Sequence, residues 1–159
     1  MNTRLFGEIN IEKDKEICFE SGLIGFPDYT RYALIFDADK PEKRGISWLQ
    51  SLEDGQFALP VIDPLLIRSD YAPDIDDEIL KSLGELNEEN TYVLVTVTAT
   101  ARKEDISVNL KAPIIINTDT RKAVQVITEN DFPVKYKIYE TLKKEKAGEN
   151  CAGVDEKKG

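Results

Sequence analysis

The sequence predicts a mainly β protein: a small antiparallel β-barrel or barrel-like sandwich of about eight to ten short strands, with one short helix near residues 74–83. Short apolar runs with period-two alternation recur along the chain, separated by residues typical of turns, and no strand–helix–strand rhythm occurs. The length of 159 residues and the hydrophobic content of 41% suit one domain with a single core.

The strongest strand signal lies in residues 92–100. Valines at the odd positions alternate there with threonines, a pattern typical of a strand that is buried on one face only. Shorter runs of the same kind predict further strands at residues 5–11, 17–19, 32–36, 46–52, 57–62, 106–110, 114–116, 123–127 and 134–138.

One helix is expected within this β pattern. Pro73 precedes Asp74, which we expect to be the N-cap, and apolar residues then recur at four-residue spacing up to Gly84. Acidic side chains near the N-terminus of a helix are stabilised by its dipole. Three acids fill the predicted first turn: Asp76, Asp77 and Glu78.

The chain is predicted to divide into one folded domain, residues 1–142, and a disordered charged tail, residues 143–159. The tail has almost no apolar residues. It carries 5 basic and 4 acidic residues out of 21 and 30 in the whole chain, so residues 1–142 hold 16 basic and 26 acidic residues, a difference of −10. The acidity therefore belongs to the predicted domain.

The amino-acid composition argues against several classes of function. The chain contains no histidine, which removes the commonest general base and metal ligand, and we expect no cofactor. A net charge of −9 opposes direct binding to nucleic acid or to an anionic membrane. No signal peptide or membrane-spanning run is present, and Cys18 and Cys151 do not suggest a disulfide, so a cytoplasmic location is expected.

The cysteine and serine residues show no pattern typical of catalytic nucleophiles. Cys18 lies in a predicted strand without a histidine to deprotonate it, so we expect a buried structural thiol. No Gly-x-Ser-x-Gly turn accompanies the serines. Acid pairs at strand ends remain possible, and they leave a carboxylate-pair hydrolase open as an alternative; the candidates are Asp37, Asp39, Asp63 and Asp119. A small-ligand-binding β-barrel is a second alternative.

The densest charge lies in the acidic segment, residues 70–89. It holds eight acidic residues and a single basic one, Lys81. Such a run is typical either of a solvated face or of a surface that docks a basic protein, and an exposed Tyr71 would anchor the contact. The residues expected to bind a partner are Asp70, Tyr71, Asp74, Asp76, Asp77 and Glu78.

Several strings, in order along the chain, resemble the FliW family of flagellar assembly factors. They include Gly-Leu-Ile-Gly-Phe at residues 22–26, Trp-Leu-Gln-Ser at 48–51, Val-Ile-Asp-Pro at 61–64 and Asn-Leu-Lys-Ala-Pro-Ile at 109–114. The resemblance covers roughly residues 3–140. The loop at residues 44–47 departs from it, because a proline and an aromatic residue often stand there in the family.

The resemblance implies a regulator without enzymatic activity. FliW proteins bind the translational repressor CsrA, which keeps it off flagellin messenger RNA, and they also bind newly made flagellin, so that the two partners exchange. An acidic protein docked on a basic RNA-binding repressor would also repel the phosphates of RNA. The expected partners are therefore CsrA and flagellin.

Most residues of the family strings are expected to be structural. The two glycines of the first string supply turn conformations, two apolar side chains fill the core beneath that turn, and the asparagines close turns through their side chains. Trp48 is expected in the core. The full set is Gly22, Leu23, Gly25, Phe26, Trp48, Gln50, Asp63, Pro64, Asn109, Pro113 and Asn117.

Overall fold

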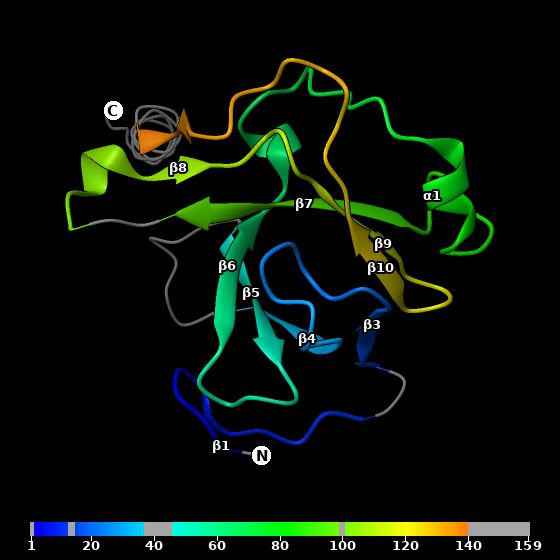
Figure 1. Cartoon of the computed structure of the whole chain (residues 1–159). Helices are drawn as coiled ribbons and strands as arrows, with labels where there is room; N and C mark the ends of the chain where they lie inside the picture. The colour runs from blue at the N-terminus through cyan, green and yellow to red at the C-terminus, as the bar shows by residue number, and fades with distance from the viewer. Residues whose placement is uncertain (1, 13–14, 37–45, 99–100, 140–159) are drawn as a thin grey trace, which may run out of the picture.

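The structure is a computed structural model that describes residues 2–12, 15–36, 46–98 and 101–139. Within these residues it has eleven strands and one short α-helix (Figure 1). In chain order the elements are β1 (Asn2–Thr3), β2 (Gly7–Glu8), β3 (Ile17–Phe19), β4 (Arg31–Phe36), β5 (Ile46–Ser51), β6 (Ala58–Ile62), η3 (Pro64–Leu66), α1 (Asp77–Lys81), β7 (Thr91–Thr98), η4 (Lys103–Asp105), β8 (Ser107–Val108), β9 (Ile114–Asn117), β10 (Lys122–Gln125) and β11 (Tyr136–Lys137).

Seven strands close into a barrel, in the order β7-β6-β5-β4-β3-β10-β9 and back to β7. Every neighbouring pair is antiparallel except β3 and β10, which are parallel. A closed ring with an odd number of strands cannot alternate in direction all the way round, so one parallel pair is required. The predicted small β-barrel is confirmed, and its expected all-antiparallel pairing has this one exception.

Side chains fill the interior of the barrel. The inner cluster combines aromatic and branched residues from most of its strands, and five partly buried apolar side chains pack against it. A barrel of this size has an interior just wide enough for its own side chains. The buried members are Ile17, Phe19, Leu23, Tyr32, Leu49, Val61, Leu94, Ile114, Ile116 and Ala123.

A second apolar cluster lies outside the barrel. Leu94 belongs to the inner cluster, whereas Val95 and Val97 belong to the outer one, because successive side chains of a strand point to opposite faces. The chain around residues 67–76 and the segment after β10 cover this face at the top of Figure 1. The sequence predicted a strand buried on one face at residues 92–100; instead, both faces of β7 are covered.

The N-terminal hairpin covers part of the outer wall at the bottom of Figure 1. The backbone N–H of Arg4 donates to the carbonyl oxygen of Gly55, and Phe6 meets Trp48 edge to face at 6.3 Å between ring centroids. Trp48 is therefore half-buried beneath the hairpin and belongs to neither core cluster, which corrects the expectation of a core side chain. A single strand at residues 5–11 was a wrong prediction, since the Thr3 hydroxyl and Gly7, at φ 66°, turn the chain back within this range.

Two further predictions need correction. The helix spans Asp77–Lys81, not residues 74–83, because the backbone at Asp76 is still extended, with φ −60° and ψ 126°. Cys18 is exposed, since β3 places Ile17 and Phe19 in the core and the residue between them on the outer face. The whole predicted tail, residues 143–159, and the end of the predicted domain, residues 140–142, lie outside the described residues.

Candidate protein-docking surface

The acidic segment, residues 70–89, connects η3 to β7 and contains α1, at the right of Figure 1. The N-cap of α1 is Asp76, whose carboxylate accepts a hydrogen bond from the Glu78 N–H at 2.9 Å, so the predicted cap at Asp74 is wrong. Asp74 instead accepts from the Asn130 side chain at 3.1 Å, and its own N–H donates to the Asn130 side-chain oxygen. This exchange ties the segment to the chain that follows β10.

All eight carboxylates of the acidic segment are exposed. Some of their charge is already matched: Arg68 holds Asp70 in a two-bond ion pair, with the shorter contact at 3.2 Å, which lowers the pKa of Asp70. Lys81 lies 3.5 Å from Glu78. The sequence placed the docking charge at residues 70–78, where several of these acids have partners.

Six of the eight acids have no ion pair within the described residues. Two of these six, Asp74 and Asp76, use their carboxylates in the hydrogen bonds described above. The other four carboxylates have no side-chain hydrogen bond within the same residues and are exposed on both sides of Lys81, where a basic group can approach them. They are Asp77, which the sequence singled out, and Glu85, Glu88 and Glu89.

Tyr71 does not lie on this surface. Its side chain is 6% exposed, its ring packs on Phe132 at 4.8 Å, and its hydroxyl donates to the Leu110 carbonyl oxygen at 2.7 Å. Burial raises the pKa of Tyr71 to about 12. The expected exposed aromatic anchor is therefore a residue of the outer core, because the C-terminal segment covers it.

Asn117 fixes the end of the acidic segment to the barrel. Its Nδ2 donates to the carbonyl oxygens of Leu83 and Glu85, at 2.9 and 3.2 Å. Its Oδ1 accepts from the N–H groups of Asp119 and Thr120, which closes the turn after β9 as the sequence predicted. A residue expected only to shape a turn thus also positions the docking segment.

Other family-string residues behave as predicted. Asn109 accepts hydrogen bonds from the N–H groups of Lys111 and Ala112, and Asp63 caps η3, in which Pro64 follows it. Gln50 is fully buried, and its amide donates to carbonyl oxygens of the turn between β5 and β6. Pro113 is buried just before β9.

The first family string forms a tight turn. Gly22 and Gly25 adopt φ 68° and 91°, the left-handed region that favours glycine, and Leu23 is buried, as predicted. Phe26 corrects the expectation of a core side chain, because it is 40% exposed and contacts Phe57 at 4.4 Å between ring centroids. Nothing in the sequence indicated that this apolar side chain lies at the surface.

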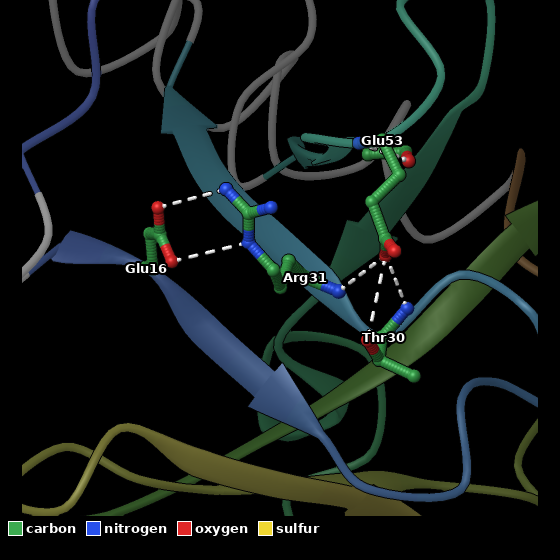
Figure 2. Close-up of polar contacts among 5 residues, drawn as sticks. Glu16, Thr30, Arg31 and Glu53 are labelled. Carbon is green, nitrogen blue, oxygen red and sulfur yellow. Dashed lines mark hydrogen bonds and ion pairs between the residues drawn. The ribbon is translucent and has the colours of Figure 1, made fainter.

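A cluster of charged side chains lies at the junction of β3 and β4 (Figure 2). Arg31 reaches both carboxylate oxygens of Glu16, at 3.1 and 3.3 Å. The carboxylate of Glu53 accepts from the N–H groups of Arg31 and Thr30, at 3.0 and 2.6 Å. These two hydrogen bonds lower the pKa of Glu53. The cluster combines one cation with two carboxylates at the start of β4.

Of the four acids considered for catalysis, the two that the structure describes have structural roles. Asp63 caps η3, and Asp119 accepts from Asn90 at 3.1 Å, while Asp37 and Asp39 lie outside the described residues. Among the described residues no group of three potential metal ligands occurs. Within the same part of the chain, every helix is too short or too polar to cross a membrane.

Comparison with known proteins gives a consistent result. The profile of the family described as FliW protein matches residues 1–138. The flagellar assembly factor FliW of Lachnospira eligens is 42% identical over 147 residues, which cover 91% of this chain and 97% of the relative. That of Lachnoclostridium phytofermentans is 45% identical over 139 residues, or 87% and 89% of the two chains.

A solved structure agrees with these relatives. The crystal structure of a flagellar assembly factor FliW has a TM-score of 0.79 and 27% identity to this chain, and covers 87% of this chain and 95% of its own. Fold, profile and sequence identity therefore coincide over nearly the whole length. This chain belongs to the FliW family of flagellar assembly factors.

Proposed function

We propose that this flagellar assembly factor acts as a post-transcriptional regulator that binds the translational repressor CsrA and, in exchange, newly made flagellin. Family membership carries the proposal, since the match extends over residues 1–138. Bound CsrA would be kept from flagellin messenger RNA, and flagellin that accumulates would displace it. The binding of CsrA and its displacement by flagellin would both take place in the cytoplasm.

The acidic segment is the proposed docking surface for CsrA. Its exposed carboxylates would attract a basic RNA-binding protein and speed the encounter. The same charge would repel RNA phosphates from the bound repressor. Asn117 and Asn90 support this role, because both donate to the Glu85 carbonyl oxygen and hold the segment in one position.

We also propose that the protein performs no catalysis. A general acid needs a carboxyl group whose pKa is raised, whereas the shifts at Glu53, Asp54 and Asp70 are all downward. Hydrogen bonds from neighbouring N–H or O–H groups, and from Arg68 in the case of Asp70, cause these shifts. Side chains also fill the barrel interior, which argues against a small-ligand-binding barrel.

The first test is complex formation. The full chain is mixed with purified CsrA, and separately with flagellin, at micromolar concentration, and each mixture is run on size-exclusion chromatography. The proposal expects a shifted peak with each partner and displacement of CsrA when flagellin is added. If neither partner shifts, the regulator proposal is wrong.

The second test locates the surface. The triple variant Asp77→Lys, Glu85→Lys, Glu88→Lys reverses unpaired charges without removing the Asp76 cap. We expect CsrA affinity to fall by at least about tenfold, in line with removal of several complementary charges. The matched control, Glu8→Lys, Glu12→Lys, Glu129→Lys, has the same net charge at exposed positions elsewhere. Equal losses in both variants would exclude a local docking surface.

A further inference from the structure

The turn at residues 22–27 exposes apolar side chains that the fold does not use. Ile24 is 51% exposed and Phe26 is 40% exposed. Phe57 lies in ring contact with Phe26 at 4.4 Å and with Tyr29 at 5.3 Å, so three aromatic rings form one continuous edge. Isolated exposed apolar residues are ordinary, but a cluster backed by aromatic rings in contact marks a binding surface more strongly.

The turn is held rigidly in this position. A Cβ atom at Gly22 would lie 2.5 Å from the Phe26 carbonyl oxygen, so the backbone strands of the turn are in direct contact. The Phe26 N–H donates to the Leu23 carbonyl oxygen at 2.8 Å. Gln125 accepts from the Ile24 N–H at 2.9 Å and donates to Ala112 at 3.2 Å. A preorganised apolar surface loses little entropy on binding.

Carboxylates border the aromatic edge. Asp54 accepts a hydrogen bond from the Tyr29 hydroxyl at 2.7 Å, and Asp28 is exposed one residue away in the chain. The pKa of Tyr29 is raised by the hydrogen bond to Asp54, by burial and by the negative charges of Asp54, Asp28 and Glu53. Three carboxylates therefore lie close enough to act on one phenol.

The nearby cation does not cancel this charge. Arg31 is held by both oxygens of Glu16 (Figure 2). Beneath the edge, the fully buried Tyr32 ring lies 6.3 Å from Phe57, and its hydroxyl has no hydrogen-bond partner among the described residues. The pKa of Tyr32 is raised by burial and also by the negative charge of Glu53.

From this geometry we infer a second docking surface, made by Ile24, Phe26, Tyr29, Phe57 and the carboxylate of Asp28, for a protein segment that carries Arg or Lys beside an aliphatic side chain. Aromatic faces hold the cation and its apolar stem, and carboxylates bind its charged end. The same negative charge disfavours nucleic acid and anionic lipid. The inference needs neither CsrA nor flagellin, so it stands apart from the proposed function.

The test is a titration of the full, isotopically labelled chain with a short peptide of alternating leucine and arginine, followed by amide chemical shifts. The probe is compared with the same peptide carrying glutamine in place of arginine. We expect saturable shifts at residues 24–29 and 57 with the arginine peptide, and at least about tenfold weaker binding of the glutamine peptide. Shifts confined to the acidic segment, or equal affinity for both peptides, would overturn the inference.

Variants make the test specific. Asp28→Lys reverses an exposed charge that makes no side-chain hydrogen bond to the described residues, and Ile24→Ser removes an exposed apolar side chain, so both should fold. Each variant should bind the arginine peptide with an affinity lower by about threefold or more. The control Leu65→Ser removes an exposed apolar residue elsewhere and should leave binding unchanged. Wild-type affinity in both test variants, or a loss in the control as large as theirs, would contradict the proposed surface.

Discussion

Asn117 donates a 2.9 Å hydrogen bond from its side-chain amide to the carbonyl oxygen of Leu83, across 34 positions of the sequence. The bond joins the last residue of β9 to the turn that follows α1. Because Asn117 and Leu83 are both buried, this hydrogen bond is shielded from water. The position of the acidic segment therefore depends on a barrel residue far away in sequence.

Replacing Asn117 by alanine should destabilise the protein by about 2–4 kcal/mol, because the buried Leu83 carbonyl oxygen and three part-buried backbone groups lose their partner together. Urea unfolding measures the loss, and hydrogen exchange should show faster opening at residues 83–91. Thr118→Ala, at an exposed neighbour, is the control and should stay within about 0.5 kcal/mol of wild type. Unchanged exchange in the Asn117 variant would contradict the proposed anchoring.

The two glycines of the turn should respond differently to alanine. Both have positive φ, so each substitution costs about 1 kcal/mol of backbone strain. At Gly22 the new Cβ also collides with the backbone of Phe26 and Pro27, whereas at Gly25 it meets nothing within 4 Å. We expect Gly22→Ala to lower the free energy of unfolding by at least about 2 kcal/mol more than Gly25→Ala does, as measured by thermal or urea unfolding. Equal losses of stability in the two variants would contradict a close contact between Gly22 and the backbone of Phe26 and Pro27.

Tyr71 should make the fold sensitive to alkaline pH. Its pKa is raised from 10.0 to about 12 on folding, so its contribution is fully present below pH 10 and is lost as the pH rises toward 12. Tyr71→Phe removes this titration but also the hydrogen bond to Leu110, which costs about 1 kcal/mol at neutral pH. The stability gap between wild type and variant should therefore shrink between pH 10 and pH 12; a constant gap would contradict the prediction.

Glu53 should contribute to the loss of stability in acid. Its pKa is lowered from 4.5 on folding, so its contribution is present above pH 4.5 and is lost as the pH falls through the lower folded value. Glu53→Gln keeps an acceptor for the Thr30 and Arg31 N–H groups but removes the charge. Thermal unfolding below pH 4.5 should then depend less on pH than in wild type. Glu129→Gln, at an exposed site, should retain the wild-type profile.

Local signals predicted several features correctly because their causes lie within a few residues. The alternation at residues 17–19 and 46–52 predicted β3 and β5 closely, and Asn109 closes its turn with a neighbour two residues away. The helix was predicted too long, because Asp74 and Asp76 are equally good caps by type. Asp74 instead exchanges hydrogen bonds with Asn130, 56 positions away, so Asp76 becomes the cap.

The burial of particular residues needed long-range contacts. Tyr71 resembled an exposed anchor because it stands among acids, but the chain around Phe132 covers it. Phe26 resembled a core residue because it is large and apolar, yet its turn leaves it at the surface. Both errors arise because side-chain burial depends on which distant segment packs above a position, and no local pattern records that.

The sequence by itself determined the mainly β class, the turn chemistry of its glycines and asparagines, the acidity of the folded domain and the resemblance to the FliW family. These follow from periodicity, backbone preferences and composition, which act over short range. Only the tertiary structure decided the closure of the barrel through a parallel β3–β10 pair, the two-sided burial of β7 and the surface on which each carboxylate stands. Those depend on pairing between residues far apart in the chain, where the free energy comes from packing and not from local preference.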